Sequence, residues 1–321
     1  MTVVFQRSRG SKRSAVFVTL LLESRLREIA VPNMNGLLVI DKPSGMTSRD
    51  VVNRVQKWFP RKTKIGHTGT LDPLATGVLV VCIGTATRLA DYVQAMGKSY
   101  TSRFRFGASS TTDDADGTVT ETPDAVSPTR EQVETALASF VGTIEQMPPA
   151  YSALKLDGVR AHKLARAGKD VPLAARRVRI DAIRLVGYEW PFADVEVDCG
   201  KGTYIRSIAR DAGECLGVGG MVQTLRRTRV GPFTAEQGVS IDADPGHVKL
   251  LPMSLAVAGM PRVVVEPEIV ARLRHGQRVR FELPVGEAIR PIAVFQPDGE
   301  FVGTVLPHES GTIKADVLFR D

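Results

Sequence analysis

The residues of this chain that could do chemistry gather in one stretch, residues 66–77, which reads GHTGTLDPLATG. It holds a carboxylate, Asp72, five residues after an imidazole, His67. Pro73 biases Asp72 away from the helical backbone region and the glycines permit turns, so the stretch predicts a loop, here called the Asp72 loop. A carboxylate presented by a rigid loop can serve as a nucleophile. The simpler alternative is a turn in which Asp72 bonds its own backbone.

The segments on either side predict how this loop is held. Residues 78–83 form a continuous apolar run, short enough to be a strand buried on both faces. Upstream, residues 36–41 predict a second apolar strand, followed by a polar loop. Thr47 then predicts a helix N-cap with Asp50 completing a capping box, and the spacing of apolar residues predicts an amphipathic helix over residues 48–58.

A second group of polar residues lies at a predicted corner. Residues 200–206, GKGTYIR, predict a tight turn that leads into a helix with Thr203 as its N-cap. Tyr204 and Arg206 then belong to the first turn. An arginine gains nothing from the positive end of a helix dipole, so Arg206 should have a carboxylate partner. A surface ion pair with Asp211 is the alternative to a partner in an active site.

Together these motifs resemble those of the TruB-type tRNA pseudouridine synthases. Residues 66–79 match every fixed position of the family's catalytic motif, G-H-x-G-x-L-D-P-x-A-x-G-x-L. Further strings of that family follow in the same order, at residues 98–100, 148–168, 202–206 and 219–231. The resemblance therefore covers residues 36–231.

The resemblance implies roles for individual residues. Asp72 would be the nucleophile, Arg206 its partner, and Tyr100 the ring that stacks on the target uracil and helps to remove the C5 proton. The residues implied to bind the substrate are His67, Tyr204, Leu225 and Lys42. His67 would fill the gap that the flipped uridine leaves, and Lys42 would support the active site or a phosphate. The alternatives are a core tyrosine, a core leucine, a solvated lysine and a structural histidine.

Basic segments beyond these motifs suggest a polyanionic partner. Residues 155–184 carry nine Lys and Arg against three Asp, and residues 201–229 carry six against two acids. The family uses the insertion at residues 148–178 to grip RNA, and phosphate contacts need charge more than shape. The residues expected to bind RNA are Lys155, His162, Lys163, Arg166, Arg226 and Arg227. A solvated basic face is the alternative.

The implied reaction breaks the N1–C1′ bond of a uridine, turns the base and joins C5 to C1′. The substrate implied is the T-loop uridine of tRNA, at position 55 of tRNA numbering, which must be flipped out of its stack. Whether Asp72 attacks C1′ or C6, or stabilises a glycal-type intermediate, is left open by the sequence. No cofactor and no metal are expected, because nothing is reduced and a carboxylate suffices.

Composition and residue spacing argue against a membrane span, a zinc site, disulfides and a calcium site. The chain has 321 residues, 43% of them hydrophobic, a net charge of +7, and no apolar run that approaches the roughly 20 residues of a membrane span. Cys82, Cys199 and Cys215 lie far apart, which predicts three reduced core thiols rather than a zinc site or disulfides. The aspartates of residues 111–117, here called the acidic loop, lack the ligand spacing of a calcium loop. The resemblance implies an ordinary surface turn there.

The expected fold class is α+β. The resemblance implies a mixed α/β catalytic domain on one large, mainly antiparallel sheet at residues 35–250. A small β-rich, PUA-like RNA-binding domain is expected at 251–321, and a basic, disordered extension at 1–34. The expected protein is a cytoplasmic monomer that acts on the T-arm of tRNA without a membrane or an obligatory protein partner. Two rivals are a tRNA-folding factor with little catalysis and a retaining glycoside hydrolase, which needs a second carboxylate roughly 5 Å away.

Overall fold

The computed structural model describes residues 34–152, 172–281, 290–308 and 311–319, and the backbone alone at 155–156 and 159–160. The extension expected at residues 1–34 lies outside the described residues except for Met34. Residues 35–321 cluster into a single unit by their contacts. The boundary expected near residue 250 stays a prediction.

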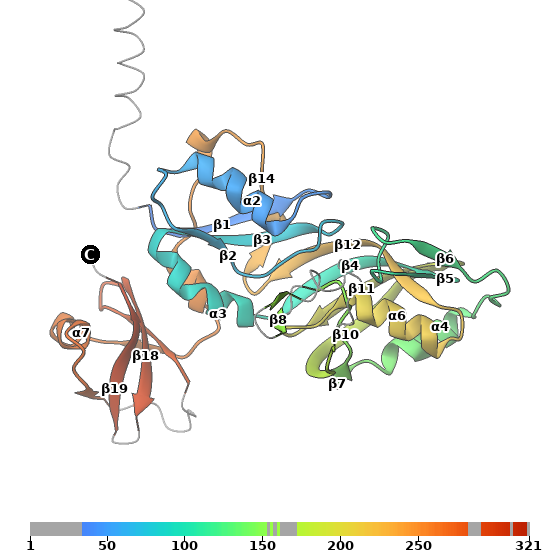
Figure 1. The fold of residues 1–321 in the computed structure, drawn as a ribbon. Coiled ribbons are helices and arrows are strands. Elements are labelled where there is room, and N and C mark those ends of the chain that lie inside the picture. The colour runs from blue at the N-terminus through green and yellow to red at the C-terminus, as the bar shows by residue number, and fades with distance from the viewer. Residues whose placement is uncertain are drawn as a thin grey trace, which may run out of the picture. The chain divides into compact units, whose positions relative to one another are not determined.

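A ten-stranded sheet organises this unit (Figure 1). Its main path runs β14-β1-β3-β12-β4-β11-β10-β7, with β2 beside β3 and β13 beside β12. The strands are β1 (Gly36–Lys42), β2 (Ile65–His67), β3 (Thr76–Ile83), β4 (Lys98–Phe106), β7 (Gly142–Gln146), β10 (Arg176–Glu189), β11 (Phe192–Cys199), β12 (Gly220–Val230), β13 (Phe233–Thr234) and β14 (Val239–Ser240). Only the β1–β14 and β3–β12 pairs of this sheet are parallel. The expected large, mainly antiparallel sheet is confirmed.

Helices join and cover these strands. They are α2 (Ser48–Val55), α3 (Ala90–Ala95), α4 (Arg130–Ala138) and α6 (Ile205–Cys215). Two short hairpins, β5 (Ala108–Ser110) with β6 (Val119–Glu121) and β8 (Lys155–Leu156) with β9 (Val159–Arg160), complete this part. The predicted capping box of Thr47 and Asp50 is present, and a 3₁₀ turn at Gln56–Trp58 extends the first helix to its expected end.

The predicted N-cap of α6 is wrong by one residue. Tyr204 is the N-cap, and its own side chain makes no capping hydrogen bond. The hydroxyl of Thr203 instead donates to the Gly200 carbonyl at 3.3 Å. The buried Gln146 side chain instead fixes the backbone of the N-cap residue, because it donates to the Tyr204 carbonyl at 3.0 Å and accepts from the Tyr204 N–H at 2.8 Å.

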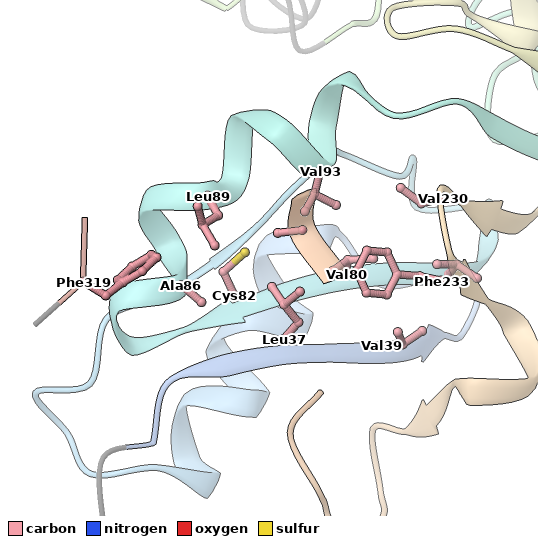
Figure 2. Packing of buried hydrophobic residues seen from close by; sticks show 12 residues of the cluster. Leu37, Val39, Val80, Cys82, Ala86, Leu89, Val93, Val230, Phe233 and Phe319 are labelled. Atoms are coloured by element: carbon pink, nitrogen blue, oxygen red, sulfur yellow. The ribbon is translucent and has the colours of Figure 1, made fainter. Parts of the chain in front are cut away.

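The apolar residues of β1 and β3 form the core beside the Asp72 loop. Figure 2 shows Leu89 and Val93, from the helical segment 84–95, packed towards Cys82 and Leu37. All four side chains are fully buried. The continuous apolar run of residues 78–83 is therefore buried on both faces as predicted, which makes β3 a rigid anchor for the loop that precedes it.

The parallel seam between β3 and β12 requires a glycine. Arg227 pairs with Gly77 in this register, and Gly77 has a φ of +94°. A Cβ at Gly77 would lie 2.2 Å from the Arg227 carbonyl oxygen. The last glycine of the Asp72 loop thus permits the close approach that brings β12 alongside it.

The C-terminal residues form a five-stranded sheet in the order β15-β17-β18-β19-β16. Its elements are β15 (Arg262–Val264), α7 (Pro267–Arg274), β16 (Val279–Arg280), β17 (Ile292–Phe295), β18 (Phe301–His308) and β19 (Thr312–Leu318). The predicted helix and the β17–β18 hairpin are confirmed. Phe319 belongs to the same core cluster as β1 and β3, and Arg88 donates to the Leu318 carbonyl at 2.6 Å. The β-rich character is confirmed, and its likeness to PUA domains stays a prediction.

The structure bears on two expectations from composition, which concern the cysteines and membrane spans. Cys82 and Cys199 are buried, but Cys215 is exposed near the end of α6, so the prediction of three core thiols is wrong for Cys215. The apolar stripe of α6 faces the sheet, which leaves position 215 towards solvent. Among the described helices, none has the length and apolarity of a membrane span.

We predict that Gly213→Ala destabilises the protein, although alanine favours a helix interior over glycine by about 1 kcal/mol. A Cβ at Gly213 would lie 2.2 Å from the backbone of Gly219 and Gly220, so helix and strand would have to separate. Urea denaturation should show a free energy of unfolding lower by about 2 kcal/mol. The control is Gly259→Ala, whose Cβ meets nothing within 4 Å. Equal stability of both variants would contradict the prediction.

Candidate active site

The Asp72 loop is held residue by residue by the segment 42–48, here called the bracing loop. The Ser48 hydroxyl accepts from the Leu71 N–H at 2.8 Å and donates to the Leu71 carbonyl at 3.1 Å. The Gly45 N–H donates to the Pro73 carbonyl at 2.9 Å. Both neighbours of Asp72 are therefore fixed by hydrogen bonds, which limits where its carboxylate can point.

Lys42 also holds the Asp72 loop in place by hydrogen bonds. It is fully buried, and its ammonium donates to the carbonyls of Pro43 at 2.9 Å, Met46 at 2.6 Å and Pro73 at 3.2 Å. Burial lowers the pKa of Lys42 to about 8, although the charge of Asp72 opposes that shift. All three N–H donors are thus in use within the protein. The expectation that Lys42 supports the active site fits this geometry, whereas direct contact with a substrate phosphate does not.

Arg227 holds the other side of the loop, and its predicted role in RNA binding needs correction. The residue is 2% exposed. Its guanidinium donates to the Val78 carbonyl at 2.7 Å and the Gly69 carbonyl at 3.1 Å. A side chain buried in this way positions the Asp72 loop, and it lines a cavity beside that loop rather than the outer surface.

Arg206 pairs with Asp72 as the resemblance implied. Its Nη2 lies 3.0 Å from Asp72 Oδ2, and the Arg206 side chain is 4% exposed against 30% for Asp72. The same guanidinium donates to the carbonyls of Thr112 at 2.6 Å and Tyr151 at 3.0 Å. Arg206 thus holds one carboxylate oxygen of Asp72, and the carboxylate as a whole remains partly exposed.

The acidic loop is part of this site, which corrects its interpretation as a surface turn. Asp114 is 3% exposed, and its carboxylate lies 3.2 Å from Arg206 Nη1. Burial raises the pKa of Asp114, against the effect of a hydrogen bond from Thr112 and of the Arg206 charge. Arg206 therefore sits between two carboxylates. The three aspartates of the acidic loop were the sequence signal for Asp114, because an aspartate in a turn need not face solvent.

Two cavities meet at the Asp72–Arg206 pair. The first has a volume of about 280 Å³ and is lined by both residues together with Tyr100, Tyr204 and Leu225. The second has a volume of about 680 Å³, and His67 lines it beside Asp72 and Arg206. The structure thus brings together the three residues expected to be catalytic and three of the four expected to bind the substrate.

The environment of Tyr100 favours stacking over proton transfer. The residue is 8% exposed, and burial raises the pKa of its phenol above the ordinary value of 10.0. At neutral pH the hydroxyl is then protonated, so it is poorly suited to accept the C5 proton. The ring lies in the first cavity with Leu225, where a planar base could pack between apolar surfaces.

Tyr204 stands at the rim of the same cavity. The guanidinium of Arg176 lies over its ring, 4.5 Å from the centroid. Together with the Gln146 contacts to its backbone, this cation–π interaction fixes the aromatic ring. Sequence reasoning missed Gln146 and Ser48, and it gave no role to Lys98, a nearly buried lysine of the first cavity. A single polar residue in a strand or at the start of a helix gives no periodic signal.

The residues expected to bind RNA are only partly described. Arg226 makes a two-point ion pair with Asp41, with both N–O distances at 2.9 Å, so part of its charge is already compensated. Lys155 lies on β8, with its side chain outside the described residues. His162, Lys163 and Arg166 also lie outside the described residues. Among the parts described, no cluster of His, Cys, Asp or Glu could hold a metal.

Comparison with known proteins places this geometry in context. A model described as the N-terminal domain of the TruB family pseudouridylate synthases matches residues 57–205. A second, described as the tRNA pseudouridylate synthase B C-terminal domain, matches residues 206–243, which span α6 to β14.

Individual relatives agree with these matches. The chain is 46% identical over 248 residues to a tRNA pseudouridine synthase B of Mycobacterium sp. strain KMS, covering 75% of this chain and 83% of that protein. It is 40% identical over 294 residues to that of Thermobifida fusca, covering 89% and 98%. Among solved structures, one chain of a Cbf5-Nop10-Gar1 complex is 26% identical with a TM-score of 0.66, over 84% of this chain and 78% of that one.

We predict that pseudouridine formation, the reaction implied by the resemblance, slows as the pH rises through about 8. Because the pKa of Lys42 is lowered to about 8, its ammonium is present below that pH and lost above it, together with one donor to the loop. Single-turnover rates between pH 7 and 9 test this. Lys42→Met should be about tenfold slower with a flat profile. Lys98, whose pKa is also lowered to about 8, provides the control: a flat profile in Lys98→Met instead would contradict the assignment.

We predict that Arg227→Gln weakens the fold but leaves the salt dependence of RNA binding unchanged. Loss of the guanidinium leaves buried carbonyls without a hydrogen-bond donor, so the free energy of unfolding should fall by about 2 kcal/mol or more. The slope of log K against log salt counts phosphates neutralised, and a buried arginine neutralises none. Arg177→Gln, at an exposed position of β10, serves as the stability control. A slope smaller by about one in Arg227→Gln would restore the RNA-binding role.

Proposed function

Because this chain belongs to the TruB family of pseudouridylate synthases, we propose that it isomerises uridine to pseudouridine in tRNA. The observation that carries the proposal is the ion pair of Asp72 Oδ2 with Arg206 Nη2 at 3.0 Å, at the junction of two cavities. A partly exposed carboxylate with a buried cationic partner is what a nucleophilic aspartate requires. The relatives' printed name supplies tRNA as the substrate class.

Each group at the site has a part in the proposed reaction. Asp72 uses Oδ1 towards the ribose or the base, while Arg206 holds Oδ2 and compensates its charge. The N1–C1′ bond breaks, the uracil turns between Tyr100 and Leu225, and C5 joins C1′. The C5 proton then leaves to water or to the carboxylate, because Tyr100 is protonated at neutral pH, and N1 takes up a proton from water, so that the product is an isomer of the substrate. No step needs an electron donor or acceptor.

The target uridine must leave its stack to enter a cavity of about 280 Å³. We propose the T-loop uridine at position 55 of tRNA as that target, which is consistent with the family. His67 lines the neighbouring cavity and is placed to take the position of the flipped nucleotide. The protein would do this as a cytoplasmic monomer without an obligatory protein partner.

The two rival functions fit the site less well. A retaining glycoside hydrolase needs a second carboxylate as acid and base. Asp114 pairs with the same Arg206, but its side chain is 4% exposed and engaged by Thr112 and Arg206. A folding factor without catalysis would not need a carboxylate fixed through both its neighbours and its partner arginine. A chaperone role beside catalysis is compatible with the proposal.

We predict that wild-type protein releases one tritium per tRNA from a transcript labelled at uridine C5, and that Asp72→Asn releases none while still binding tRNA. The amide keeps the shape of the side chain but removes its nucleophilic charge. Asp124→Asn, in an exposed loop, is the matched control and should behave as wild type. Tight tRNA binding without release by the wild type would favour the folding factor. Equal release by wild type and Asp72→Asn would show that the carboxylate is misassigned.

A further inference from the structure

We propose that Arg210 and Asp113 form a second arginine–aspartate clamp that positions Arg206 for its pairing with Asp72. The inference rests on the proposed function and adds two positioning residues to it. Arg206 and Arg210 lie four residues apart in α6 and therefore on the same face of the helix. Both reach the acidic loop, through adjacent aspartates: Arg206 to Asp114 and Arg210 to Asp113.

The guanidinium of Arg210 donates hydrogen bonds to three different segments. Its Nη1 donates to Asp113 Oδ2 at 2.8 Å, and its Nη2 donates to the Met147 carbonyl at 2.9 Å. Its Nε donates to Asp211 on the same helix at 2.8 Å. The side chains of Arg210 and Asp113 are only 22% and 16% exposed. Such a planar fork fixes direction as well as distance, which a lysine at this position would not do.

The segments that Arg210 joins are those that hold Arg206. The carbonyls of Thr112 and Tyr151 accept hydrogen bonds from Arg206, and they lie one and four residues from the groups that Arg210 binds, Asp113 and Met147. Ser207 donates to the same Met147 carbonyl at 2.8 Å. The clamp thus fixes both segments that accept hydrogen bonds from the Arg206 guanidinium. Neither Arg210 nor Asp113 lines either of the two cavities.

The backbone of Asp113 has an unusual conformation. Its φ of +60° makes it the sole described non-glycine residue in the left-handed region. Aspartate and asparagine tolerate that region better than most residues. The loop is tied to β12 independently, because the Val222 N–H donates to the Asp113 carbonyl and the Ala115 N–H donates to the Val222 carbonyl, each at 3.0 Å. The loop should therefore stay folded when the charge pair is removed.

The test measures single-turnover tritium release with enzyme in excess, so that an inactive fraction does not affect the rate constant. Arg210→Gln and Asp113→Asn should each slow the chemical step by about tenfold to a hundredfold, because a small displacement of a catalytic group is costly. Their Kd for tRNA should stay within about threefold of wild type. The double variant should be no slower than the slower single variant, since both changes remove one clamp.

Two further variants sharpen the test. Arg210→Lys, which keeps the charge without the fork, should recover part of the rate lost in Arg210→Gln. Asp194→Asn is the matched control, because it breaks the ion pair with Arg103 on a different part of the sheet and should leave the rate unchanged. Wild-type rates in Arg210→Gln, additive losses in the double variant, or a loss of tRNA binding that equals the loss of rate would each overturn the clamp. An inactive wild type would instead overturn the proposed function.

Discussion

The structure depends on one buried cation, the guanidinium of Arg206. It lies in the first turn of α6, at the positive end of the helix dipole, where an unpaired arginine would be destabilising. Two carboxylates and two carbonyls offset that cost, and they come from three loops far apart in the sequence. Because a buried charge without partners is expensive, the fold of each loop is tied to the presence of the others.

The Asp72 loop is positioned by hydrogen bonds to its backbone, together with the buried side chains of Leu71 and Ala75. Ser48, Gly45 and Lys42 hold Leu71 and Pro73, while Arg227 holds Gly69. Because these contacts fix the backbone on both sides of Asp72, the loop can keep that side chain partly exposed. The two polar residues beneath it, Lys42 and Arg227, are therefore buried for a positional reason.

Sequence patterns predicted what is periodic or local. The buried run of β3, the capping box at Thr47 and the amphipathic α2 each follow from residue spacing, and the motif resemblance led from Arg206 to Asp72. Contacts across the chain were beyond such patterns. Nothing local distinguishes Arg227, buried in the β3–β12 seam, from Arg226 beside it, which pairs with Asp41 at the surface. Asp114 was mistaken for a turn residue because burial depends on the partner, not on the turn.

The buried cations of this protein position the Asp72 loop, whereas the exposed cations are the ones available to bind RNA. Lys42, Arg206 and Arg227 are all buried, and each donates to protein oxygens, so the positive charge around the Asp72 loop serves the protein's own geometry. Attraction of RNA must then come from cations that remain exposed, such as Lys201 at the edge of the first cavity. Since a buried cation adds little to the salt-dependent part of binding, affinity and catalysis in this protein should respond to different arginines and lysines.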